Sequence, residues 1–271
     1  SGVGSDPARI ATIADPEDRR IAELFRGIDD PSKFLGAAHY RRVRFQLGQK
    51  DRFLGGYKLS GEYLPYMEEI FIERGMPFEL TRLPFVESSF NTLARSKVGA
   101  SGIWQFMRTT GADFMEIDEA VDERNDPLRA TEAAAKLLKI NRETNRLGTS
   151  DLEEVILRNR IRGFGFASAN FFACLIAALE VERNPERYFG PTDRLRPHRF
   201  FEVKLPKGIF LKDVLSFLRL KRKAVVELNP ALTDLALRSK VAIPAGYRLR
   251  VPNPNGSGTD ADLAAKRRVF L

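Results

Sequence analysis

The chain has 271 residues, of which 43% are hydrophobic and 30% are charged. This length suits one large domain, or one medium and one small domain, and the apolar fraction excludes general disorder. No run of about 18 apolar residues occurs, so we expect no transmembrane segment. The one cysteine excludes an internal disulfide and a Cys-rich zinc site. We expect the opening SGVGSDP to be a cloning remnant joined to a mature protein, so that a missing leader does not argue for the cytoplasm.

The net charge of +8 is unevenly distributed. Residues 191–271 carry 17 basic and 7 acidic side chains, a balance of +10, which leaves −2 for the rest of the chain. This basic segment is either a solvated surface or a surface that attracts a polyanion, and charge alone does not identify that polyanion.

In chain order, residues 5–56 read as short helices and loops, with helical character over 16–25 and 39–47 and a break at 51–56. From residue 60 the apolar side chains recur at intervals of three and four, as in a helix. Ser60 is the expected N-cap of that helix, and Gly75 its expected end. The recurring positions are Tyr63, Tyr66, Met67, Ile70 and Phe71.

A second helix is predicted over residues 77–86, with Pro84 disturbing its last turns. Glu87 would then lie at the carboxyl end of this helix among Phe85, Val86 and Phe90. Apolar surroundings and the negative end of the helix dipole both disfavour a charged carboxylate, so we expect the pKa of Glu87 to be raised. Residues 96–105 form a predicted loop whose small residues would permit close approach of the backbone to a ligand.

Asp126 and Pro127 read as the N-cap and first residue of a helix that runs to about Arg142. Another helix is predicted over 168–183, with Cys174 as a buried small side chain. The pattern then changes to a strand over 201–205, helices over 211–218 and 222–228, and a turn and strand over 243–252.

Two motifs at this spacing carry a resemblance to a known family: Glu87-Ser88 and Gly102-Ile103-Trp104-Gln105-Phe106. They resemble the lytic transglycosylases with the goose-type lysozyme-like fold, in particular the membrane-bound type with lysin-motif repeats. The likeness is close over residues 71–135 and looser to 190. It implies a mostly α catalytic domain, a peptidoglycan substrate, a single catalytic glutamate and neither metal nor cofactor.

The resemblance implies that Glu87 protonates the leaving oxygen of the glycosidic bond and then acts as a base on the muramoyl 6-hydroxyl, giving a 1,6-anhydro product. It assigns substrate contact to Gln105, and we add Ser88, Ser101, Phe106 and Met107 as candidates. Trp104 is interpreted as a core residue, because it lies beside Ile103 and Phe106.

A hydrolytic muramidase would need a second carboxylate. The candidates are Asp113, Glu116, Asp118, Asp122 and Asp126. None has an apolar setting like that of Glu87; Asp122 reads as the ion-pair partner of Arg124, and Asp126 as a helix cap. Their settings favour the one-glutamate mechanism.

The sequence departs from the family pattern in two places. The Ala-Tyr-Asn motif expected after Arg142 is absent. Either the protein lacks this element or, as we favour, residues are skipped between Glu143 and Leu147; a further skip near Asn159 is a second option. A family tyrosine near Phe171 or Phe172 is also missing, and both phenylalanines read as core residues.

The strand–helix–helix–strand pattern near the carboxyl end resembles a lysin-motif module, on Leu228-Asn229-Pro230 and residues 244–249. Lys207-Gly208-Ile209 replaces the usual Gly-Asp pair, which puts glycan binding in question. The fold class we predict is a mostly α lysozyme-like domain with a small C-terminal βααβ module. The expected parts are an N-terminal helical extension (1–59), the catalytic domain (60–190), the C-terminal module (191–253) and a flexible basic tail (254–271).

We therefore predict a monomeric peptidoglycan-cleaving enzyme of the periplasm or the cell exterior. The alternatives are a hydrolytic lysozyme of the same fold and a non-catalytic cell-wall-binding protein. Nucleic-acid binding through the basic segment is not expected, because the sequence carries no recognised nucleic-acid motif.

Overall fold

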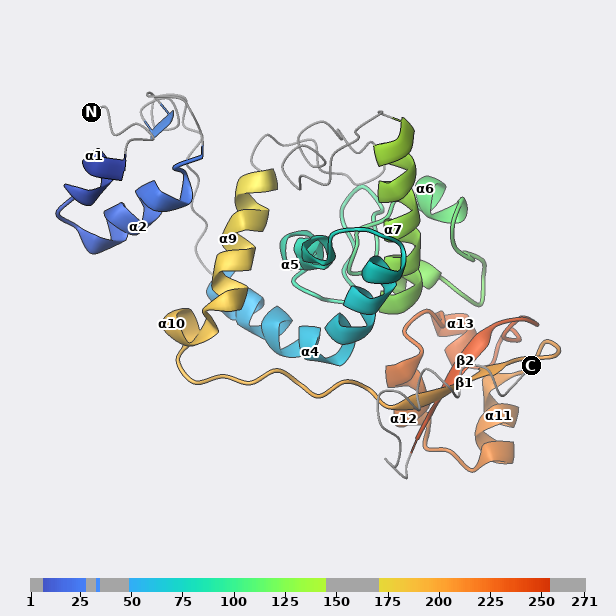
Figure 1. The fold of residues 1–271 in the computed structure, drawn as a ribbon. Coiled ribbons are helices and arrows are strands. Elements are labelled where there is room, and N and C mark those ends of the chain that lie inside the picture. Colours follow the sequence, from blue (N-terminus) through green and yellow to red (C-terminus); the bar gives the residue numbers. More distant parts are fainter. Residues whose placement is uncertain (1–6, 28–32, 35–48, 145–170, 254–271) are drawn as a thin grey trace. The chain divides into compact units, whose positions relative to one another are not determined.

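The computed structural model describes residues 7–27, 33–34, 49–144 and 171–253, and the chain forms two compact units, Ser1–Gln49 and Lys50–Leu271 (Figure 1). The first unit contains α1 (Pro7–Ala11) and α2 (Pro16–Leu24). The Asp15 carboxylate caps α2 by accepting from the backbone N–H of Glu17 and Asp18, which confirms the helix predicted over 16–25. The helix predicted over 39–47 and the tail predicted over 254–271 lie outside the described residues.

The second unit is mostly helical with one small sheet, as the sequence predicts. None of the helices in the described part of the chain is long and apolar enough to cross a membrane. Its elements are α4 (Gln49–Glu73), the 3-10 helix η1 (Phe78–Arg82), α5 (Leu83–Glu87), α6 (Arg108–Ala112), the 3-10 helix η2 (Glu123–Asn125), α7 (Pro127–Thr144), α9 (Phe171–Arg183), α10 (Pro185–Phe189), β1 (Phe200–Lys204), α11 (Leu211–Leu218), α12 (Arg222–Leu228), α13 (Asp234–Leu237) and β2 (Arg248–Pro252).

Helix α4 corrects two predictions. It runs unbroken through residues 51–56, and Ser60 is a buried interior residue whose hydroxyl donates to the Tyr57 carbonyl, not an N-cap. Gly56 has a packing role instead of a chain-breaking one, because a Cβ there would lie 2.6 Å from the carbonyl oxygen of Ser89. The helix also crosses the expected boundary at residues 59 and 60; the four-part division of the chain stays a prediction.

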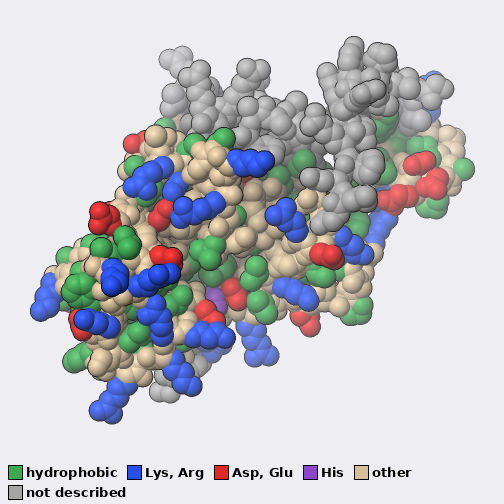
Figure 2. Space-filling model, turned by 180° about the vertical axis from the view of Figure 1, so that it is seen from behind, with side chains coloured by type: hydrophobic (Ala, Val, Ile, Leu, Met, Phe, Trp, Pro, Cys, Tyr) green, Lys and Arg blue, Asp and Glu red, His purple; other side chains and the backbone are tan. Residues whose placement is uncertain are grey.

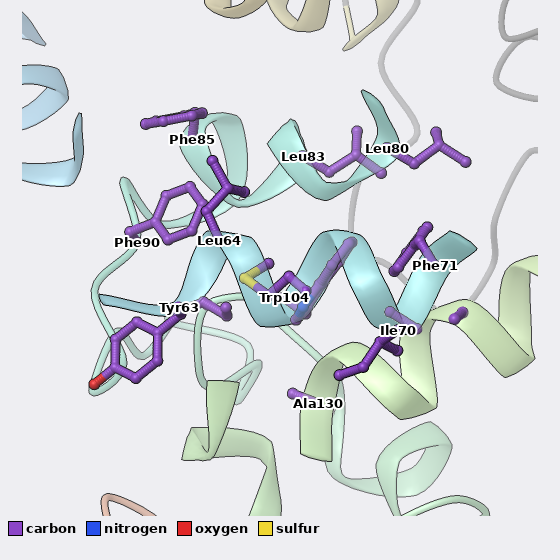
Figure 3. Packing of buried hydrophobic residues seen from close by; sticks show 14 of the residues in the cluster. Tyr63, Leu64, Ile70, Phe71, Leu80, Leu83, Phe85, Phe90, Trp104 and Ala130 are labelled. Carbon is purple, nitrogen blue, oxygen red and sulfur yellow. The ribbon is translucent and has the colours of Figure 1, made fainter. Parts of the chain in front are cut away.

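The larger hydrophobic core of the second unit surrounds Trp104, which is fully buried (Figure 3). Its indole stacks on Phe71 of α4 with ring centroids 5.7 Å apart, and its Nε1–H donates to the Thr131 hydroxyl of α7 at 2.8 Å. These contacts confirm Trp104 as a core residue. Helices α4, α5, α7 and α9 all contribute side chains to this cluster.

Helix α7 begins as predicted. The Asp126 carboxylate accepts from the N–H groups of Leu128 and Arg129, and the side chains of Leu128, Ala134, Ala135 and Leu138 are buried. The prediction for Cys174 was wrong: its side chain is exposed, because it lies on the outer face of α9 while Leu175 and Leu179 point into the core.

The C-terminal module has the predicted order of elements, with α13 as an addition that the sequence pattern did not indicate. Strands β1 and β2 pair antiparallel, with Glu202 opposite Arg250. Of the fourteen Lys and Arg residues in 191–253, twelve are exposed, against four exposed carboxylates, and these cations gather over the module in Figure 2. Whether the module is a lysin motif stays a prediction.

Candidate active site

Glu87 is the last residue of α5. We predicted one helix over 77–86, but the structure forms two short ones, η1 and α5. Pro84 lies in the first turn of α5, where its missing N–H costs nothing, so it helps begin this helix and does not disturb the end of a longer one.

The Glu87 carboxyl is largely shielded from water. Its Oε1 atom is buried and has no hydrogen-bond partner within the described residues. Burial raises the pKa of Glu87 from its usual value of 4.5 to about 8, because the surroundings disfavour the charged form. Burial is the cause found for this shift, and the contribution that we expected from the carboxyl end of the helix stays a prediction. At neutral pH this carboxyl keeps its proton.

The backbone after Glu87 is strained. Ser89 and Phe90 have φ angles of 52° and 57°, and Gln105 has a φ angle of 50°. All three lie in the left-handed region that residues other than glycine rarely adopt. Phe90 is buried, with its ring centroid 4.6 Å from that of Phe85. Such strain persists only where the surrounding structure enforces it, and it often concentrates at functional sites.

The segment of residues 96–106, here called the 96–106 loop, lies against the end of α5. The Ser88 hydroxyl donates to the Ile103 carbonyl at 2.9 Å, and the loop closes on itself through a hydrogen bond from Ser101 N–H to the Phe106 carbonyl. Gln105, the predicted substrate contact, follows Ile103 by two residues in this loop. Its side-chain amide donates to the carbonyls of Gly102 and Ala94 at 2.8 and 3.2 Å.

The other predicted substrate contacts divide into two groups. Ser101 and Phe106 are buried, and the Ser101 hydroxyl donates to the Asn125 side chain at 2.7 Å. We retain neither side chain as a substrate contact. Met107 is partly exposed, as are Ser88 and Glu87, so these three keep a surface that a ligand could reach.

Arg124 braces the 96–106 loop, a role that the sequence did not suggest. Its guanidinium pairs with the Asp122 carboxylate in a bidentate arrangement, with nitrogen–oxygen distances of 2.8 and 2.9 Å, and all of this is buried. The remaining nitrogen donates to the carbonyls of Gly99 and Phe106. The predicted ion pair of Asp122 and Arg124 is therefore confirmed.

The glycines of this loop serve its own packing. A Cβ on Gly102, whose φ is +79°, would lie 1.7 Å from the Arg124 carbonyl oxygen. We predicted that small residues in this loop let a ligand approach the backbone. At Gly102, the backbone of Arg124 occupies that space.

The candidate second carboxylates are occupied or exposed. Asp118 accepts from the N–H groups of Ala120 and Val121, Asp122 pairs with Arg124, and Asp126 caps α7. Asp113 and Glu116 are exposed. None of them shares the buried, unpartnered state of Glu87 within the described residues.

Two sequence departures fall outside what the structure describes. The absent Ala-Tyr-Asn motif and the proposed skips after Glu143 and near Asn159 concern residues 141–170, whose side chains are not described. The same holds for the side chains of Phe171 and Phe172, although α9 begins at Phe171.

The helical fold, with one buried acid beside a braced loop, defines a lysozyme-like domain. Residues 70–155 match the family model described as the transglycosylase SLT domain. The chain is also 28% identical over 202 residues to proteins named membrane-bound lytic murein transglycosylase D, from Escherichia coli strain K12 and from Escherichia coli O6:H1. These matches confirm the resemblance to lytic transglycosylases.

Each of these alignments covers 68% of this chain but only 43% of the relative. The chain thus spans less than half the length of these curated relatives. The lysin-motif part of the resemblance stays a prediction.

Proposed function

We propose that this chain is a peptidoglycan lytic transglycosylase in which Glu87 is the only acid and base. The observation that carries the proposal is the state of its carboxyl: buried, unpartnered at Oε1 and with a pKa raised to about 8. A carboxyl that keeps its proton near neutral pH is what general acid catalysis at a glycosidic oxygen requires. The names of the relatives, which refer to murein, support this choice of substrate.

In the proposed reaction Glu87 donates its proton to the oxygen between N-acetylmuramic acid and N-acetylglucosamine. The bond from that oxygen to the muramoyl anomeric carbon then breaks. Glu87, now a carboxylate, takes the proton of the muramoyl 6-hydroxyl as this oxygen bonds to the anomeric carbon. The product is a 1,6-anhydro sugar, and the glutamate regains its proton without consuming water.

Product analysis tests this mechanism against its alternatives. Mass spectrometry of fragments released from purified peptidoglycan should find 1,6-anhydromuramoyl ends. Reducing muramoyl ends would instead indicate the hydrolytic lysozyme, which needs a second carboxylate to activate water. Protein that pellets with peptidoglycan but releases no fragments would indicate a cell-wall-binding protein without catalysis.

The pH dependence of cleavage should follow the protonated fraction of Glu87. Because the pKa is raised to about 8, the acid is protonated below this pH, and the rate should fall tenfold per pH unit above it. A pH–rate profile on a glycan substrate measures this limb directly. A rate that begins to fall near pH 4.5 would show that Glu87 titrates as an ordinary carboxyl and would contradict the assignment.

The basic C-terminal module supports the proposed substrate, since peptidoglycan bears peptide carboxylates that exposed Lys and Arg side chains attract. We propose action in the periplasm or outside the cell, where this substrate lies, as a monomer. Salt-sensitive retention on DNA would revive the nucleic-acid alternative.

A further inference from the structure

The sequence suggests that the C-terminal module is a separate binding unit, but its contacts are those of an integral part of the catalytic domain. Ala120 and Val121, which precede η2, are buried in the core of the module, together with Leu232 and Ala236. Backbone hydrogen bonds run between the same segments, from Asp122 N–H to the Ala231 carbonyl at 2.8 Å and from Thr233 N–H to the Ala120 carbonyl at 2.9 Å.

A buried ionic network joins β2 to the start of α7. The Arg250 guanidinium donates to the Asp126 carboxylate at 2.7 Å and to Glu202 at 3.2 Å, and Arg129 also donates to Glu202. Both Arg250 and Asp126 are almost fully buried. The backbone of Arg250 is held as well, because the Asn229 side chain pairs with its N–H and its carbonyl at 2.9 and 2.7 Å.

The segment before β1 is fixed in the same way. Leu195 N–H donates to the Lys58 carbonyl of α4 at 2.9 Å, and the Tyr66 hydroxyl donates to the His198 carbonyl at 2.8 Å. Both connections to the module, through residues 190–199 and through 118–126, are therefore made by packed and hydrogen-bonded chain.

The residues that the module holds are directly next in the chain to those that brace the loop near Glu87. Asp126 follows Arg124 and Asn125 directly, and these two bind Gly99, Phe106 and Ser101 of the 96–106 loop. In turn, the Ile103 carbonyl of that loop accepts a hydrogen bond from the hydroxyl of Ser88, the residue after Glu87. The contacts form one continuous series from the module to the acid.

We propose that the C-terminal module is a brace of the catalytic domain and that Arg250 is a positioning residue, which holds the 96–106 loop against Glu87 through Asp126. This inference rests on the proposed function for its kinetic consequence, but its structural part can be measured without activity. Removing the contacts of the module with residues 118–126 would impair the active site whether or not the module binds glycan.

The test uses Arg250→Met in the full chain, which keeps the stem of the side chain and removes the guanidinium. We expect a kcat on soluble glycan fragments lower by about 10- to 100-fold, because a displaced loop misaligns substrate and acid, with less change in KM. The emission of Trp104, the only tryptophan, should shift in the folded protein, since its backbone belongs to the displaced loop and its indole is anchored in the core by Thr131. A substitution that affected stability alone would leave both quantities unchanged in the folded fraction.

Arg238→Met is the matched control. Arg238 is an exposed arginine of the same module whose guanidinium lies 3.7 Å from Asp234, so the same change of charge should alter neither kcat nor Trp104 emission. If Arg250→Met does not fold, Arg250→Lys decides, because an amine keeps the charge at Asp126 but cannot bridge Asp126 and Glu202 as the guanidinium does. Unchanged kcat and emission in whichever of the two variants folds would overturn the proposal.

The two proposals fail separately. If Glu87→Gln retained cleavage, the proposed function would fall, while a Trp104 shift in the Arg250 variant would still support the brace. If the Trp104 emission stayed unchanged while Glu87→Gln was inactive, only the brace would be rejected.

Discussion

Replacing Glu87 with glutamine is expected to lower the rate of peptidoglycan cleavage by roughly 10²- to 10⁴-fold, the usual contribution of a general acid or base. Glutamine has the shape of the protonated acid, but its amide neither donates a proton to the leaving oxygen nor accepts one from the 6-hydroxyl. Because the native carboxyl is already neutral near pH 6, the substitution should leave the fold and the affinity for glycan nearly unchanged. Release of soluble fragments from purified peptidoglycan measures the rate.

Glu73→Gln is the control for the loss of a carboxylate, since Glu73 ends α4 in an exposed position and should tolerate the change without loss of activity. Stability provides a second, independent check. With a folded pKa near 8 against 4.5 when unfolded, Glu87 binds a proton more tightly in the folded state, so its contribution to stability is complete below pH 4.5 and is lost as pH rises to about 8. The melting temperature of Glu87→Gln should not show this decline with rising pH. If Glu87→Gln cleaved peptidoglycan at the native rate, Glu87 would not be the catalytic acid.

The sequence predicted those parts of the molecule that local rules decide. The cap at Asp126, the pair of Asp122 and Arg124, and the helices of the C-terminal module depend on neighbours within a few residues, and all were found where expected. Glu87 was proposed as the acid from the same kind of local pattern, because its apolar neighbours and the downstream motif lie within 20 residues.

Contacts between distant segments were not predictable from the same patterns. Glycines 55 and 56 suggested a break, but both lie inside α4, and Gly56 leaves room for the Ser89 carbonyl. Local sequence patterns do not reveal that contact. Ser101 and Phe106 were assigned to substrate because Ser101 precedes the matching motif and Phe106 ends it. In the structure the Ser101 hydroxyl bonds to Asn125, and Phe106 is buried in the core. The bond from Arg250 to Asp126 joins residues 124 positions apart, which periodicity cannot reveal.

Substituting Gly102 with alanine is the second change with a large expected effect. The new Cβ would lie 1.7 Å from the Arg124 carbonyl oxygen, so the loop or the Arg124 backbone must move. Left-handed strain of about 1–3 kcal/mol and overpacking of about 1–3 kcal/mol together suggest a loss of roughly 2–6 kcal/mol in the free energy of unfolding. Chemical denaturation followed by Trp104 fluorescence measures this loss. Cleavage should fall as well, because the moved backbone belongs to the loop that contacts Ser88.

Gly99→Ala separates the two causes within the same loop. Gly99 also has a left-handed backbone, with φ of +89°, but a Cβ at this position would meet nothing within 4 Å beyond its chain neighbours. The Gly99→Ala variant should therefore lose only about 1–3 kcal/mol in the free energy of unfolding, the cost of the backbone strain, and keep most of its activity. The difference between the two variants isolates the contact of the 96–106 loop with Arg124. Equal losses at both positions would mean that backbone strain, and not this contact, fixes the loop beside Glu87.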